Sequence, residues 1–249
     1  MVTAIAGAGT PETAWQTWPG LHRLPPLDLD GCRRVVLLAP HPDDEVLGVG
    51  GLLRQLAARG ATVEVVAVTD GEASHPGSRS VTPQRLAALR RLESVAALGN
   101  LGLDSARVHR LGLPDGGLAA VEPAMMTAVG GVFERAAPGT WCLSTWDGDG
   151  HPDHEAVGRV AQGVCRRYGV RLLMYPIWTW HWALPDDPRV PWSRARSIAL
   201  DDDTHAAKLA AVDCFASQIL PLSPAPQDAP ILTPAMLDRL CRRTEVVLI

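Results

Sequence analysis

The chain holds two short stretches whose side chains could do chemistry together, and the first is His41-Pro42-Asp43-Asp44-Glu45. It places one imidazole and three carboxylates within five positions. Like charges this close disfavour one another's ionised forms, and a bound cation is the simplest relief. The alternative is a solvated turn, in which an aspartate caps the following helix and Glu45 complements the helix dipole. That alternative explains the carboxylates but leaves the histidine unexplained.

The second stretch is His151-Pro152-Asp153-His154, and it also follows a predicted strand. Ligands of open parallel sheets bind beyond the carboxyl ends of the strands, so the fold could bring the two stretches together. Three nitrogen or carboxylate donors with an open fourth position are typical of a catalytic zinc site. A structural zinc site is usually rich in cysteine, and neither stretch contains one. Magnesium would require more oxygen ligands and fewer imidazoles.

Both stretches must be positioned by a regular fold, and the hydrophobic pattern indicates which one. Four consecutive apolar residues at 35–38 predict a buried parallel strand, which prolines then end. Strands alternate with helices along almost the whole chain, which indicates right-handed βαβ units with helices on both faces of a mostly parallel sheet. The predicted strands are 35–38, 62–68, 107–111, 140–144, 171–175, 196–200 and 246–249, and the main predicted helices are 45–59, 83–98, 123–135, 155–168, 202–216 and 234–241.

We therefore expect a single-domain α/β protein, a three-layer Rossmann-like sandwich over residues 1–249 with a lead-in at 1–32. The net charge of −4 and the absence of a basic run exclude a nucleic-acid footprint. The sequence contains no run of 18 apolar residues, so it predicts no membrane span. Five scattered cysteines and an N-terminus unlike a signal peptide predict reduced thiols and a cytoplasmic location. The oligomeric state stays open, with a homo-oligomer as one alternative.

The two stretches, together with Gly48 and Gly51, closely resemble the signature motifs of the LmbE-like, or PIG-L, family. Its members are zinc-dependent deacetylases of N-acetylglucosaminyl substrates. Weaker similarities extend the resemblance to roughly residues 33–220; they are Thr69-Asp70-Gly71-Glu72, Arg90 to Glu93, Leu113-Pro114-Asp115-Gly116, Lys208 and Ser217-Gln218.

The resemblance implies a role for each residue of the two stretches. The residues that match the family's Zn²⁺ ligands are His41, Asp44 and His154. Asp43 matches the general base, and His151 matches the histidine that meets the developing oxyanion, a role that its protonated form could fill. Asp153 is expected either to keep His151 charged or oriented, or to cap the next helix. Glu45 is expected to belong to the first turn of a helix.

Further side chains are candidates for contact with the substrate. Asp115 follows a predicted strand and could bind sugar hydroxyls or support a ligand, whereas Arg90 could reach the site or form a surface pair with Glu93. Trp146 lies in the loop that carries the second stretch.

The aromatic segment 178–182 is a feature of this sequence in particular. Trp178, Trp180 and Trp182 alternate, so in an extended chain they share one face and form either a hydrophobic wall or a platform for a sugar ring or acyl chain. His181 lies on the other face and could point toward the metal.

Together these features predict an enzyme that acts on linear C–N amide bonds. It would use zinc-activated water to remove an acetyl or longer acyl group from the amine of an amino sugar, with a small-molecule glycoside as substrate. The first alternative is a metallohydrolase that acts on a non-sugar amide or ester. An alternative of another class is a non-enzymatic Rossmann-like binding module, which the lack of a glycine-rich dinucleotide fingerprint disfavours.

Overall fold

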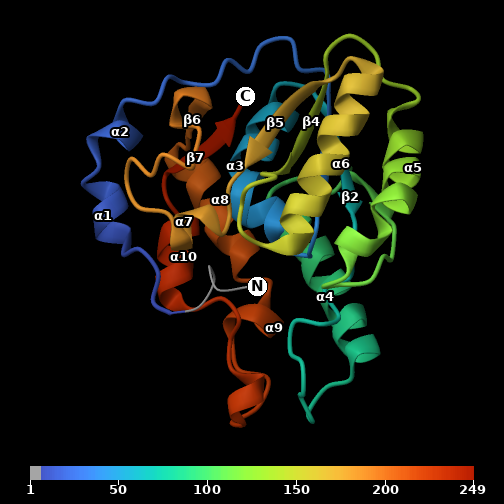
Figure 1. Cartoon of the computed structure of the whole chain (residues 1–249), viewed down its shortest axis with the longest axis vertical. Coiled ribbons are helices and arrows are strands. Elements are labelled where there is room, and N and C mark those ends of the chain that lie inside the picture. The colour runs from blue at the N-terminus through green and yellow to red at the C-terminus, as the bar shows by residue number, and fades with distance from the viewer. Residues whose placement is uncertain (1–6) are drawn as a thin grey trace.

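Residues 7–249 are described by the structure, a computed structural model, so residues 1–6 of the predicted lead-in lie outside the described part. Seven strands of the described chain form one sheet in the order β3-β2-β1-β4-β5-β7-β6 (Figure 1). The strands are β1 Arg34–Ala39, β2 Thr62–Ala67, β3 Arg107–Arg110, β4 Thr140–Thr145, β5 Arg171–Tyr175, β6 Ala195–Ala199 and β7 Thr244–Leu248. The first five strands in this order, β3, β2, β1, β4 and β5, pair in parallel. Only β7 runs antiparallel to its neighbours, β5 and β6.

Helices cover both faces of the sheet, which confirms the predicted α/β fold with a mostly parallel sheet. They are α1 Glu12–Gln16, α2 Pro19–His22, α3 Asp44–Ala58, α4 Pro83–Asn100, α5 Glu122–Phe133, α6 Pro152–Tyr168, α7 Thr179–Trp182, α8 Asp202–Val212, α9 Ala216–Ile219 and α10 Pro234–Leu240. Three short 3₁₀ turns, Leu118–Val121, Trp192–Arg194 and Pro226–Asp228, complete the elements. The predicted helix 202–216 is shorter in the structure: α8 ends at Val212, and a separate short helix, α9, begins at Ala216. In the described part, none of these helices is long and apolar enough to cross a bilayer.

Two hydrophobic cores lie on opposite faces of the sheet, and β1 contributes to both. Val35 and Leu37 pack in the core under α3 and α8, whereas Val36 and Leu38 pack in the core under α5 and α6. Figure 1 shows α5 and α6 together on one side of the sheet. Burial on both faces explains why β1 is continuously apolar instead of alternating.

The lead-in packs onto the rest of the domain through tryptophans. Trp15 is fully buried, donates from its indole N–H to the carbonyl of Trp180 at 3.0 Å, and meets the Trp180 ring edge-on at 5.1 Å. Trp192 also lies against Trp15, at 5.9 Å. Further along, the Leu27 amide donates to the Ser197 carbonyl of β6 at 2.8 Å. The lead-in is therefore part of the folded domain.

A buried ion pair between Lys208 and Glu245 binds the backbone groups left unpaired by a kink in α3, the helix that follows the first acidic stretch. The helix is kinked at Val49, where φ is −147° and ψ is 25°. Glu245 accepts the amide of Gly51 at 2.8 Å, and Lys208 donates to the carbonyl of Leu47 at 2.9 Å and to Glu245 at 2.8 Å. In an unbroken helix the Gly51 amide would donate to the Leu47 carbonyl. The kink separates these two groups, and the ion pair supplies a hydrogen-bond partner for each of them.

Replacing Lys208 should therefore destabilise the fold strongly. Lys208→Met leaves Glu245 charged and buried and the Leu47 carbonyl unpaired, and we expect a loss of about 3–5 kcal/mol in the free energy of unfolding. Arg243→Met is the control, because Arg243 pairs with Asp202 on the surface, and it should cost at most about 1 kcal/mol. Denaturant titration of the three proteins measures the difference; equal losses would contradict a buried role for Lys208.

Candidate active site

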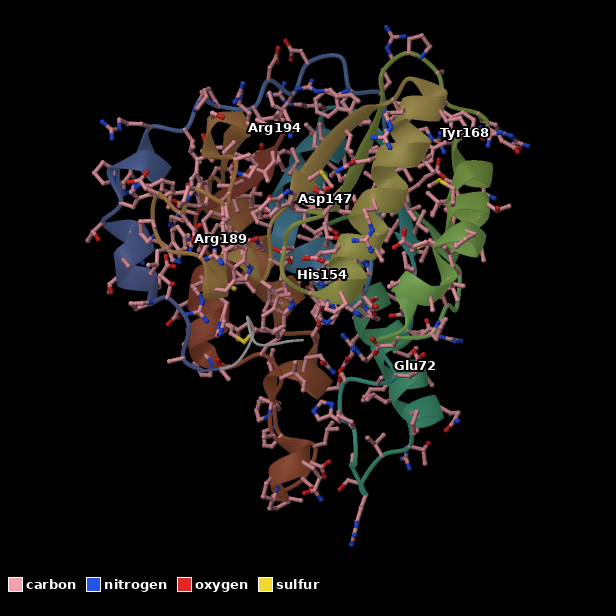
Figure 2. The ribbon with its side chains drawn as sticks, viewed as in Figure 1. Glu72, Asp147, His154, Tyr168, Arg189 and Arg194 are labelled. Atoms are coloured by element: carbon pink, nitrogen blue, oxygen red, sulfur yellow. The ribbon has the colours of Figure 1, made fainter. Side chains whose placement is uncertain are left out.

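The two acidic stretches meet at the carboxyl ends of β1 and β4, which are neighbours in the sheet. His41 Nδ1, Asp44 Oδ2 and His154 Nε2 lie 3.3 Å from one another in all three pairs. Figure 2 labels His154 near the start of α6. Ligands about 2.0–2.1 Å from a tetrahedral ion lie about 3.3–3.4 Å apart, so the three donors match one face of such a site. These residues could hold one metal ion.

A buried carboxylate fixes the orientation of His154. Asp149 Oδ2 lies 2.8 Å from His154 Nδ1, and Asp149 is fully buried. The Asp149 carboxylate also accepts the amides of Ile177, Trp178 and Thr179, at 2.9–3.0 Å. A proton on Nδ1 toward Asp149 leaves the lone pair of Nε2 free for a metal. Sequence reasoning missed Asp149; the available signal was an acid five residues before His154 in a glycine-flanked turn.

Two further carboxylates fix His41. Its Nε2 lies 3.2 Å from Asp115 Oδ1 and 3.2 Å from Asp153 Oδ2. Asp115 is therefore placed to support a ligand, one of the two roles expected for it. The Asp153 carboxylate contacts His41 and accepts the backbone amide of Gly116 at 2.7 Å, so it does not orient His151 or cap the helix as expected. Its charge does oppose the lowering of the pKa of His151.

His151 caps the N-terminus of α6. Its Nδ1 accepts the backbone amide of Asp153 at 3.2 Å, so the proton of the neutral ring lies on Nε2. Burial, followed by the charges of His154 and His41, lowers the pKa of His151 to about 3. The structure therefore favours a neutral N–H donor over the protonated histidine that the sequence suggested. The ring also lies nearly parallel to that of Trp178, with centroids 6.3 Å apart.

Asp43 occupies a strained position between the ligands His41 and Asp44. Its φ of +118° is unusual for a residue other than glycine. The Asp43 amide donates to Glu45 Oε2 at 3.0 Å, which places Glu45 in the first turn of α3 as expected. Burial raises the pKa of the Asp43 carboxyl to about 8, although the charge of Arg90 opposes the shift.

Arg90 is buried beneath this turn instead of lying on the surface. Its guanidinium donates to Asp43 Oδ2 at 3.0 Å, to the Pro42 carbonyl at 2.5 Å and to the Gly71 carbonyl at 2.9 Å. A Cβ on Gly71 would lie 2.0 Å from this guanidinium, so only glycine fits there. The alternative of an Arg90–Glu93 surface pair is wrong, because Glu93 is buried and accepts hydrogen bonds from a serine of α9.

The candidate metal ligands open into a cavity of about 460 Å³. The residues that line it are His41, Asp43, Asp44, Leu47, Ala73, Ser74, Pro76, Arg90, Asp115, Gly116, His151, His154, Ile177, Trp178, Gln218, Ile231 and Leu232. A larger open groove of about 1170 Å³ lies at the opposite end of the sheet, near the start of β2. In the described chain, the His and Asp groups that could hold a metal are not among the residues that line this groove. The smaller cavity is therefore the candidate active site.

Two protruding loops, 73–82 and 221–233, contribute to the cavity wall and lie side by side at the bottom of Figure 1. Ser80 Oγ donates to Asp228 Oδ2 at 2.6 Å, and His75 Nε2 lies 3.2 Å from the Ala229 carbonyl. Asp228 is fully buried by these contacts. Side-chain hydrogen bonds thus join the two loops into one rim.

Three of the expected substrate contacts do not line this cavity. Trp180 packs against the lead-in, His181 Nδ1 accepts a hydrogen bond from Arg239 at 2.9 Å, and the Trp146 ring covers Gly148. The expectation of an extended segment is wrong, because residues 179–182 form α7. The bonds from Asp149 to the backbone at 177–179 turn the chain there, and Trp178 is the one tryptophan that reaches the cavity.

Comparison with known proteins agrees with this geometry. The chain is similar to the 1D-myo-inositol 2-acetamido-2-deoxy-alpha-D-glucopyranoside deacetylase of Corynebacterium diphtheriae, with 29% identity over 77% of this chain and 78% of that protein. It is also similar to the diacetylchitobiose deacetylase of Thermococcus kodakarensis, with 30% identity over 51% of this chain and 46% of that protein.

The fold matches that of a solved structure, the antimicrobial reagent A40926 pseudoaglycone deacetylase Dbv21. The TM-score is 0.64 at 23% identity, and the match covers 88% of this chain and 97% of that one. The family model described as PIG-L, GlcNAc-PI de-N-acetylase, matches residues 36–165, which hold both acidic stretches. The chain therefore belongs to the PIG-L family of GlcNAc-PI de-N-acetylases.

Proposed function

We propose that this protein is a zinc-dependent hydrolase that removes an acetyl or longer acyl group from the amine of an amino sugar. The observation that carries the proposal is the triangle of His41, Asp44 and His154 donors, which shares one cavity with Asp43 and His151. Two nitrogens and one carboxylate oxygen are a donor set that suits zinc. Both relatives described above are named as deacetylases of acetamido sugars or chitobiose. The five cysteines are free thiols, which supports a reducing, cytoplasmic setting.

Zinc held by the three donors would supply the Lewis acidity that makes water nucleophilic at neutral pH and polarises the amide carbonyl. In its ionised form, which the Arg90 guanidinium and a bound cation would both favour, Asp43 accepts the proton of the attacking water and returns it to the nitrogen of the leaving amine. Arg90 and Glu45 hold Asp43 in the strained backbone conformation that directs its carboxylate into the cavity. His151 donates its Nε2 proton as a hydrogen bond to the oxygen that gains charge as the carbonyl is attacked.

The cavity also suits a substrate of this class. Its volume of about 460 Å³ lies in the range of small-molecule sites. Trp178 and Ile177 contribute apolar surface to its lining, and Ser74 and Gln218 contribute polar groups. This combination fits a sugar ring, which presents both C–H faces and hydroxyl edges.

The experiment that tests the function couples metal analysis to a screen for loss of an acyl group by mass. We expect about one zinc per chain and the release of free amine from N-acyl amino sugars, which a chelator abolishes and added zinc restores. A zinc-loaded protein that cleaves only non-sugar amides or esters would support the first alternative instead. A loaded protein that is inactive on the whole panel would overturn the proposal.

Asp149 should control metal affinity without being a ligand. Asp149→Asn removes the carboxylate that fixes the His154 tautomer, and we expect zinc affinity to fall about 10- to 100-fold. Asp147→Asn is the control, because Asp147 lies in the same turn but bonds to Gln162. Competition with a chelating dye measures both affinities; unchanged binding in Asp149→Asn would contradict the role.

Asp43 and His151 should affect turnover while the metal stays bound. We expect Asp43→Asn to lose about 10²- to 10⁴-fold in kcat and His151→Ala about 10²- to 10³-fold. His154→Ala serves as the comparison, because it should lose both metal and activity. Steady-state kinetics are measured on samples of known zinc content, and full activity in either of the first two variants would remove that residue from the mechanism.

A further inference from the structure

The outer face of α4 carries exposed apolar side chains, whereas its inner face packs against the rest of the domain. The buried side chains of the inner face are polar and apolar in equal number; they are Leu86, Arg90, Glu93, Ser94, Ala97 and Leu98. On the outer face Leu92 is 69% exposed, Val95 is 58% exposed and Leu89 is 39% exposed. These three are among only seven large hydrophobic side chains that are exposed in the described chain. A helix of 18 residues with this pattern is typical of an interaction surface.

Seven residues form a straight stripe along the helix; six of them are exposed and Gly99 is partly buried, while the exposed Arg91 lies beside the stripe. At 3.6 residues per turn, they fall within one face about 120° wide centred on Leu92. In order along α4 the stripe consists of Arg85, Ala88, Leu89, Leu92, Val95, Ala96 and Gly99. We define these seven residues as the α4 stripe.

Between its end residues, Arg85 and Gly99, the α4 stripe is symmetric in side-chain size about its centre. Reversing it around Leu92 exchanges Leu89 with Val95 and Ala88 with Ala96, so large side chains meet large ones and small side chains meet small ones. A two-fold axis perpendicular to the helix relates two copies of a chain in this way, with the two helices antiparallel. Residue i of the first copy then meets residue j of the second, and residue j of the first meets residue i of the second. The symmetry of the α4 stripe therefore favours a second copy of this chain over an unrelated partner.

Charges at the two ends of the α4 stripe complement each other in the same arrangement. Arg85 lies at one end, and Asp104 lies at the other, where a Cβ on Gly99 would be 3.4 Å from its Oδ1. Both charged side chains are exposed, and neither forms an ion pair within the described chain. The two ends are about 21 Å apart along the helix. An antiparallel second copy places its Asp104 region over Arg85, and this pairing occurs twice.

We propose that the α4 stripe is the interface of a two-fold symmetric homodimer in which the two α4 helices pack antiparallel around Leu92. The paired side chains are of the sizes that allow helices to approach within about 8–10 Å. One helix pair buries less than the roughly 1,200–2,000 Å² of standard interfaces, so the dimer dissociates on dilution. The interface is formed by the outer face of α4 and leaves the catalytic cavity accessible.

Sedimentation velocity of the full chain over a range of about 1–300 µM tests the proposal. The wild type should change from monomer to dimer with concentration, and Leu92→Gln should raise the dissociation constant at least about tenfold. The matched control is Leu184→Gln, because Leu184 is 63% exposed but lies outside α4. Far-UV circular dichroism checks that each variant is folded.

Charge reversal identifies the antiparallel arrangement. Arg85→Glu and Asp104→Arg should each weaken the dimer about fivefold or more, because each places like charges together at both ends. The double variant, which carries both changes in one chain, should restore dimerisation toward the wild-type value. A wild type that stays monomeric at the highest concentration would overturn the proposal. A dimer that is insensitive to Leu92→Gln, or a double variant weaker than both single ones, would overturn it too.

Discussion

Crowding of buried negative charge at one end of the sheet is the constraint on which the rest of the structure depends. Asp43, Asp44, Glu45, Asp149 and Asp153 are all nearly excluded from solvent. Burial without compensation would cost several kcal/mol for each ionised carboxylate, so each must be paired or hydrogen-bonded. The described contacts supply that compensation from two imidazoles, one guanidinium and several backbone amides. A bound cation would complete it.

The compensation also sets the roles of the groups. Asp149 and Asp153 each contact the outer nitrogen of a histidine, which directs the inner nitrogens toward one another. Asp44 contacts those inner nitrogens directly, whereas Asp43 is turned aside by its positive φ and held by Arg90. One cluster of similar side chains is thereby divided into donors, supports and a carboxylate that faces the cavity.

The remaining elements hold this arrangement in place. The kink in α3 lets the helix start at the acidic turn and still pack on the sheet, and the Lys208–Glu245 pair compensates the broken helix bonds. A Cβ on Gly48 would lie 2.3 Å from the ring of Tyr175, so close packing of α3 requires glycine there. The joined loops 73–82 and 221–233 then form the rim of the cavity. If α4 forms a dimer interface, the same helix supports the site on one face and assembly on the other.

The sequence by itself determined the alternation of strands and helices, the α/β class and the pairing of the two acidic stretches at one end of the sheet. These follow from local periodicity and from the rule that parallel strands share a carboxyl edge. It could not assign Asp149, the contact between Asp153 and His41, or the helical turn at 179–182. Those depend on which backbone amides converge on one buried carboxylate, and only the tertiary structure decides that convergence, because the groups come from segments distant in the chain.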